Sequence, residues 1–200
     1  MNISYLALGD SYTIGEAVLL SESYPYQTVQ LLRKAGVRVL APEIIAKTGW
    51  TTDELIASME QTIFLPSYDV VSLLIGVNNQ YRGRSVQEYK NECNHLIQTA
   101  IQLAGNNPKR VFVLSIPDWG KTPFAAERDV ATIASEIDAF NSTCKQLADL
   151  HGCYYIDITT TLRADAANVD MVASDGLHPS KLAYQKWANT LAQTILEVGF

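Results

Sequence analysis

The sequence contains little cysteine, and this shortage excludes two kinds of scaffold. Only three cysteines occur among the 200 residues, at Cys93, Cys144 and Cys153. An odd number without C-x-x-C spacing argues against a disulfide framework and against a zinc site. Cys93 and Cys144 each fall on the apolar stripe of a predicted helix, so we expect both to be buried as small hydrophobic side chains.

The chain also lacks a basic block, a basic N-terminal region and a long apolar run. Its 15 Lys and Arg against 21 Asp and Glu give a net charge of -6, which makes nucleic acid and anionic membranes poor partners. No positive charge precedes Arg33, and the run Val70 to Val77 is too short to cross a bilayer. Unless a signal peptide has been removed, we expect a cytoplasmic protein without stable membrane anchoring and without a nucleic-acid partner.

Short apolar runs that alternate with helical patterns predict the fold. The runs show little polar alternation, which is typical of strands buried on both faces of a parallel sheet. Their order and short connections predict an α/β protein, a three-layer α/β/α sandwich with a five-stranded parallel sheet, formed by a single domain over residues 1–200. The predicted strands are Ile3 to Leu8, Val37 to Ala46, Val70 to Ile75, Val111 to Ile116 and Tyr154 to Ile158.

Apolar residues at helical spacing predict amphipathic helices between these strands. The clearest covers Ser85 to Ala104, where Ser85 and Glu88 form a capping-box pattern. A second capping box, Thr51 with Glu54, begins a short helix. Two further helices are predicted from the spacing of Val130 to Leu147 and of Tyr184 to Ile195.

Three short motifs follow the first three predicted strands: Gly9-Asp10-Ser11, Thr48-Gly49-Trp50 and Gly76-Val77-Asn78-Asn79. In a parallel sheet the carboxyl ends of the strands meet at one edge, where ligands bind. Ser11 is a candidate nucleophile there. The backbone N–H groups of Ser11 and Gly49 and the amide of Asn78 are candidate donors of an oxyanion hole.

A serine nucleophile needs a base and an orienting acid, and the chain has three histidines. Neither His95 nor His151 has an acid nearby in sequence suited to orient it. His178 follows Asp175 by three residues and precedes Pro179, which favours an extended conformation at the histidine. Asp175 can therefore fold back onto one ring nitrogen and leave the other free to take a hydroxyl proton.

Each of these residues also has a structural interpretation. Ser11 can cap a helix, Gly49 can serve a turn, Asn78 can cap the following segment, and Asp175 with His178 can lie at a helix start. The functional interpretation is favoured because the motifs occur together and in order. We interpret Asp10 as an acceptor for loop N–H groups. The aromatic residues beside the motif loops are candidates for a substrate pocket or for the core; they are Trp50, Tyr81 and Trp119.

These segments resemble the sequence blocks of the SGNH hydrolase superfamily, the GDSL-type esterases and lipases. Gly-Asp-Ser at residues 9–11 matches the first block, Gly49 the second, Gly76-x-Asn78 the third and Asp175-x-x-His178 the last. The resemblance implies a flavodoxin-like SGNH hydrolase fold and a catalytic triad of Ser11, Asp175 and His178. It implies an oxyanion hole formed by Ser11, Gly49 and Asn78, and neither a cofactor nor a metal.

Two residues depart from the family pattern, Tyr12 in place of Leu and Asn79 where Asp is frequent. The resemblance predicts hydrolysis of carboxylic esters through an acyl-Ser11 intermediate, with short-chain acyl esters, acetyl esters and lysophospholipids as candidate small-molecule substrates. A thioesterase and a carbohydrate O-acetylesterase would use the same site. A non-catalytic ligand-binding domain of the same shape is the rival from another class, and the sequence leaves the oligomeric state open.

Overall fold

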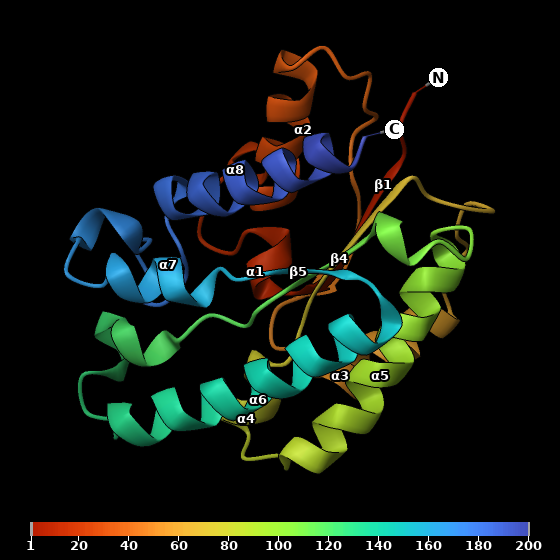
Figure 1. Cartoon of the computed structure of the whole chain (residues 1–200). Helices are drawn as coiled ribbons and strands as arrows, with labels where there is room; N and C mark the ends of the chain where they lie inside the picture. The colour runs from red at the N-terminus through yellow and green to blue at the C-terminus, as the bar shows by residue number, and fades with distance from the viewer. Residues whose placement is uncertain (1, 200) are drawn as a thin grey trace.

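A computed structural model describes residues 2–199, and its centre is a parallel sheet (Figure 1). The five strands lie in the order β2-β1-β3-β4-β5, and every neighbouring pair is parallel. The predicted three-layer fold is confirmed. The strands are β1 (Tyr5–Asp10), β2 (Glu43–Lys47), β3 (Val70–Leu74), β4 (Val111–Leu114) and β5 (Tyr154–Ile156).

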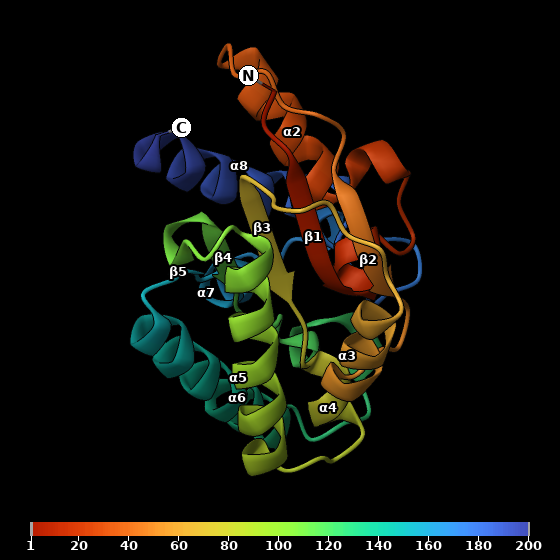
Figure 2. The ribbon, with the colours of Figure 1, turned by 90° about the vertical axis from the view of Figure 1, so that its right-hand side faces the viewer.

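Helices cover both faces of the sheet, as Figures 1 and 2 show. Two helices pack together on one face, α2 (Tyr24–Lys34) and α8 (Lys181–Val198). The opposite face carries α3 (Thr52–Glu60), α5 (Val86–Leu103) and α6 (Val130–His151). The shorter helical segments are α1 (Ser11–Ile14), α4 (Val77–Tyr81), α7 (Thr159–Ala164), η1 (Leu20–Glu22), η2 (Pro108–Arg110), η3 (Trp119–Lys121), η4 (Pro123–Ala125) and η5 (Val169–Met171).

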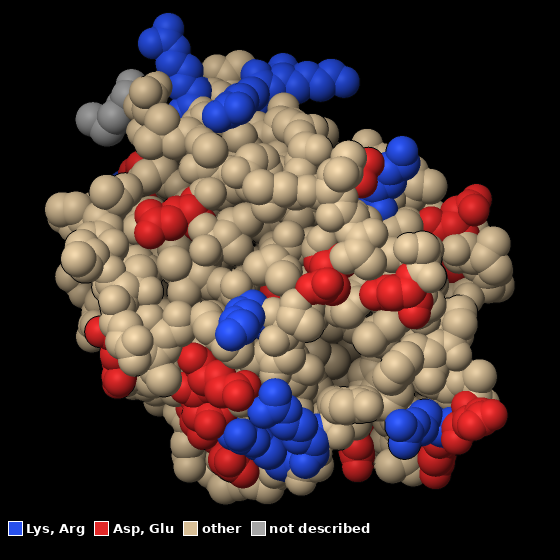
Figure 3. Space-filling view, turned by 180° about the vertical axis from the view of Figure 1, so that it is seen from behind, with Lys and Arg blue, Asp and Glu red and all other residues tan. Residues whose placement is uncertain are grey.

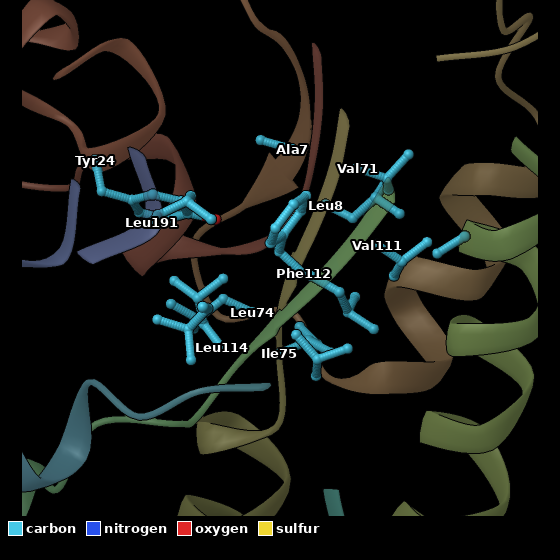
Figure 4. Close-up of a cluster of buried hydrophobic side chains, with 14 of the residues drawn as sticks. Ala7, Leu8, Tyr24, Val71, Leu74, Ile75, Val111, Phe112, Leu114 and Leu191 are labelled. Carbon is cyan, nitrogen blue, oxygen red and sulfur yellow. The ribbon is translucent and has the colours of Figure 1, made fainter. Parts of the chain in front are cut away.

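The core forms where the sheet meets the two helical layers. Every residue of β1, β3 and β4 is buried, as expected for strands covered on both faces. Figure 4 shows side chains of these strands gathered with Tyr24 of α2 and Leu191 of α8. Each fully buried Leu, Val or Phe contributes about 1.5–3 kcal/mol of hydrophobic stabilisation, so these strands hold the site at their carboxyl ends in place.

Local signals fixed several helix ends as predicted. The hydroxyl of Ser85 accepts a hydrogen bond from the N–H of Glu88 at 3.1 Å and caps α5. The predicted capping box of Thr51 and Glu54 is present at the start of α3. Cys93 and Cys144 are buried, as predicted, and their sulfur atoms lie 3.8 Å apart between α5 and α6.

The second strand differs from its prediction. The apolar pattern predicted a strand from Val37, but β2 begins at Glu43, and Val39 makes only an isolated bridge to Ile3. Pro42 directly precedes β2, and proline has no N–H to donate to a sheet ladder. The segment before it therefore forms β pairing at the bridge to Ile3 and is not part of β2.

The surface carries charges of both signs in small groups. On the face shown in Figure 3, Lys and Arg lie beside Asp and Glu, and much of the surface between them is uncharged. Ion pairs such as Arg84 with Asp53, at 2.7 Å, account for part of this mixture. Over residues 2–199 we find no helix that combines the length and the apolar character needed to span a membrane.

Candidate active site

Ser11 lies where β1 ends and α1 begins, on a sharply constrained turn. Oδ1 of Asp10 accepts a hydrogen bond from the N–H of Tyr12 at 3.0 Å, so Asp10 caps α1. This is the acceptor role that the sequence predicted. Gly9 permits the turn, because a Cβ there would lie 2.3 Å from the carbonyl oxygen of Leu74. The turn holds Ser11, whose side chain is almost fully buried, at the base of a cavity.

Ser11, His178 and Asp175 form a continuous chain of contacts. Nε2 of His178 lies 3.0 Å from Oγ of Ser11, and Nδ1 lies 2.6 Å from Oδ2 of Asp175. The other carboxylate oxygen of Asp175 accepts hydrogen bonds from the N–H groups of Leu177 and His178, at 2.9 and 3.0 Å. The aspartate therefore fixes both the loop and the imidazole, and one ring nitrogen faces the serine hydroxyl.

The electrostatics of this chain favour an ionised Asp175. Burial alone would raise the pKa of its carboxyl, but hydrogen bonds from the His178 side chain and from the N–H groups of Leu177 and His178 hold that pKa below its ordinary value. A carboxylate at Oδ2 favours a proton on Nδ1 of His178, which leaves Nε2 as the acceptor that faces Ser11.

Gly49 and Asn78 follow separate strands, and hydrogen bonds join the two segments that carry them. Gly49 has a φ of +83°, a conformation that favours glycine, and its carbonyl oxygen accepts a hydrogen bond from Nη2 of Arg82 at 2.6 Å. Nδ2 of Asn78 donates to the carbonyl oxygen of Trp50 at 3.0 Å. An asparagine amide carries two N–H donors, so this bond orients Nδ2 and leaves its second donor for another acceptor.

Asn79 also links the segment after β2 to the segment after β3, through two hydrogen bonds with Thr52. It is fully buried, its Oδ1 accepts from the N–H of Thr52 at 3.1 Å, and its Nδ2 donates to Oγ1 of Thr52 at 2.6 Å. The Thr52 hydroxyl donates in turn to a carboxylate oxygen of Glu92. Because that hydroxyl gives its proton to Glu92, its partner at position 79 must be a donor, and asparagine supplies one where the aspartate frequent in the family has none.

A cavity of about 180 Å³ opens above Ser11 and brings most of the predicted site residues together. Ser11, Gly49, Asn78 and His178 line its polar side. Asp175 does not line the cavity; its Oδ2 lies 2.6 Å from Nδ1 of His178. The remaining lining is formed by Tyr12, Thr48, Val77, Tyr81, Trp119, Phe124 and Leu177.

The predicted aromatic residues divide into two groups. Tyr81 and Trp119 line the cavity, whereas Trp50 does not: its half-buried ring packs against the core. Sequence reasoning did not identify Phe124 or Leu177. Leu177 could have been found, because it lies between Asp175 and His178 in the loop. Phe124 follows no strand end and carries no comparable signal.

The two other histidines lie away from this cavity, and neither lines it. Nε2 of His151 lies 2.7 Å from Oδ1 of Asn94. Within residues 2–199, no group of three His, Cys, Asp or Glu side chains is placed to hold a metal ion. The chemistry available at the cavity is thus that of a hydroxyl, an imidazole, a carboxylate and neutral hydrogen-bond donors.

Several solved structures share this fold. TesA is 18% identical, with a TM-score of 0.75 over 98% of this chain and 99% of that one. A lipase/acylhydrolase from Enterococcus faecalis is 18% identical, with a TM-score of 0.76 over 96% and 94% of the two chains. The acetylxylan esterase Axe2 from Geobacillus stearothermophilus is 20% identical, with a TM-score of 0.73 over 100% and 97%. No curated protein matches the sequence.

On this fold a serine, a histidine and an aspartate are linked one to the next by hydrogen bonds. These features define the class of the protein, the serine hydrolases that act on ester bonds. The model of the GDSL-like lipase/acylhydrolase family matches residues 7–186. The chain belongs to this family, which confirms the resemblance identified from its four motifs.

Proposed function

We propose that the protein is a serine esterase that hydrolyses carboxylic esters through an acyl-Ser11 intermediate. One observation carries the proposal: His178 lies 3.0 Å from the Ser11 hydroxyl through Nε2 and 2.6 Å from Asp175 through Nδ1. These are the contacts that a general base requires toward its nucleophile and toward its orienting acid.

In the proposed reaction Nε2 of His178 removes the proton of Ser11 as Oγ attacks the ester carbonyl carbon. The carbonyl oxygen becomes an oxyanion, which accepts hydrogen bonds from the N–H groups of Ser11 and Gly49 and from Nδ2 of Asn78. The imidazolium then protonates the leaving alcohol and the ester bond breaks. Water repeats the sequence on the acyl-enzyme, releases the acid and restores Ser11.

The contacts around the proposed oxyanion hole support these roles. Nδ2 of Asn78 is already oriented by its bond to Trp50, and Arg82 holds the carbonyl group of Gly49. Donors fixed before the substrate arrives need no reorganisation during the reaction, and each is typically worth about 2.7–4 kcal/mol of transition-state stabilisation.

The test is hydrolysis of short-chain p-nitrophenyl esters by the wild type and by Ser11→Ala. We expect the variant to retain the fold and to lose almost all activity. Labelling by a fluorophosphonate probe separates an esterase from a non-catalytic binding domain, because only an activated serine reacts. Equal hydrolysis rates for the two proteins would exclude Ser11 as the nucleophile.

A carbohydrate O-acetylesterase is a second candidate that uses the same residues. Tyr81 and Phe124 line the cavity yet remain 49% and 45% exposed, so they offer apolar ring faces to a bulky group outside it. An acetylxylan esterase also shares the fold. A panel of acetylated sugars, acyl thioesters, lysophospholipids and simple esters distinguishes these substrates, and the highest kcat/KM identifies the class.

A further inference from the structure

A second cavity lies directly behind one wall of the proposed active site. It measures about 30 Å³, against about 180 Å³ for the cavity above Ser11. Four residues line both cavities and separate them: Tyr12, Trp119, Leu177 and His178. The space behind them lies between α7 and the start of α8, which are neighbours in Figure 1.

The lining of the second cavity is mostly apolar. Leu162 of α7, Met171 of η5 and Ala183 of α8 contribute to it. Apolar space of this kind favours an alkyl group over water, since a water molecule needs several polar partners. A straight hydrocarbon chain that passed the wall would therefore find favourable surroundings.

Trp119 is the largest of the four dividing residues, and three contacts fix its ring. Its indole Nε1 donates to Oε1 of Gln80 at 2.7 Å, and Nε2 of Gln80 donates to Glu136 at 2.7 Å. Its ring also packs in T-shaped pairs with the rings of Tyr81 and Phe124, with ring centroids 5.3 and 5.9 Å apart. The side chain is only 5% exposed.

Hydrogen bonds of the neighbouring residue Asp118 also hold the backbone at Trp119 in place. The preceding residue, Asp118, is fully buried; its Oδ1 accepts from the N–H of Gly120 at 3.0 Å, and its Oδ2 accepts from Nε of Arg163 at 2.8 Å. Arg163 belongs to α7, so one helix beside the second cavity also anchors the wall in front of it. These contacts describe a fixed partition between the two cavities.

We propose that Trp119 sets the maximum length of the straight alkyl chain that the site accepts, and that the apolar space behind it becomes a chain-binding extension once the indole is removed. The inference rests on the proposed esterase function and deepens it: the natural substrate is an ester whose chain on that side is short. Either the acyl group or the alcohol can supply such a chain, and the test separates the two.

The experiment measures kcat/KM for two series of esters of increasing length, p-nitrophenyl esters of straight-chain acids and acetates of straight-chain alcohols. For the wild type we expect kcat/KM to fall beyond a short chain. For Trp119→Ala the fall should begin several carbons later in one series, with a gain of about fourfold for each methylene that enters apolar space. The series that responds identifies the chain as acyl or alcohol.

Two matched variants test whether the second cavity causes the change. Thr48→Ala changes the lining of the cavity above Ser11, but Thr48 does not line the second cavity and makes none of the contacts that fix Trp119, so the length limit of this variant should stay that of the wild type. Ala183→Leu fills the second cavity; combined with Trp119→Ala, it should make the length limit shorter than that of Trp119→Ala alone, because only the space left by the indole remains. Trp119→Leu, checked by circular dichroism and thermal melting, replaces the alanine variant if that variant does not fold.

Different results would overturn the proposed length limit and the proposed esterase function. If the variants hydrolyse the acetyl ester but keep the wild-type length limit in both series, Trp119 is not the barrier and the inference is overturned. If the wild type hydrolyses no ester, the proposed function fails, and calorimetric binding of decanoate still tests the barrier. The barrier predicts at least tenfold tighter decanoate binding to Trp119→Ala than to the wild type, and equal binding would overturn it.

Discussion

Asp10 should make the folded protein less stable as the pH rises from acidic to neutral. The carboxyl is fully buried, and within residues 2–199 its Oδ2 has no hydrogen-bond partner. Burial raises the pKa of Asp10 from 3.8 to about 7, against the opposing hydrogen bond from the N–H of Tyr12. The folded state therefore holds this proton in a pH range where the unfolded chain has already released it.

The direction and size of the effect follow from proton linkage. Between pH 3.8 and about 7 the folded state binds more protons at Asp10 than the unfolded state does, so stability falls as the pH rises and levels off above about 7. At about 1.36 kcal/mol for each pKa unit, the whole loss is about 4 kcal/mol. From pH 5 to pH 8 the share of this loss is about 3 kcal/mol.

Asp10→Asn removes the titration and keeps an oxygen that can accept from Tyr12. Urea unfolding of the wild type and the variant at pH 5, 6, 7 and 8 gives their difference in free energy of unfolding. That difference should move in favour of the variant by about 3 kcal/mol across the range. Asp53→Asn is the control. Burial would raise the pKa of Asp53, but hydrogen bonds from Thr51 and Arg84 lower it. Asp53 is therefore ionised in both the folded and the unfolded state from pH 5 to pH 8, so the difference in free energy of unfolding between the wild type and this variant should stay constant. A flat difference for Asp10→Asn would refute the reasoning.

Three further variants test the site. Asp175→Asn removes the carboxylate that orients His178, so kcat should fall by about 10³–10⁴ with KM little changed; a loss below tenfold in steady-state kinetics would contradict its role. Asn78→Ala should lower kcat by about 10²–10³, and an unchanged kcat would remove it from the oxyanion hole. Asn79→Ala leaves the buried N–H of Thr52 without its acceptor and should cost about 1–3 kcal/mol, measured by urea unfolding; an unchanged midpoint would show that this link is unimportant.

The sheet could be predicted from the sequence because its strands are buried on both faces. Such strands are mostly apolar along their length, as Val111–Leu114 is and as Val70–Leu74 is apart from Ser72, and this pattern is visible in the sequence. Helix α2 was not predicted. Its buried side includes Thr28, whose hydroxyl donates to the carbonyl oxygen of Tyr24, and Pro25 stands in its first turn. A polar residue on the buried face and a proline near the start hide the periodicity of a helix.

The candidate site also contains some residues that could be predicted from the sequence and others that could not. Ser11, Asn78 and His178 could be nominated because each follows a strand end or precedes a helix in a recognisable motif. The partition formed by Trp119 could not be predicted, since it depends on Gln80 and Arg163, which approach from elements distant in sequence. Contacts of this kind leave no periodic or local pattern, so they become visible only in three dimensions.

The positions of the proposed nucleophile and base along the chain have a consequence for synthesis. Ser11 precedes its partner His178 by 167 residues, whereas Asp175 and His178 lie in one short loop that leads into α8. During translation Ser11 is synthesised early, and its proposed base follows only with the loop that leads into α8, the helix that packs against α2. A chain that lacks this loop therefore carries Ser11 without its proposed base, and reactivity of Ser11 toward a fluorophosphonate would report that the loop has docked.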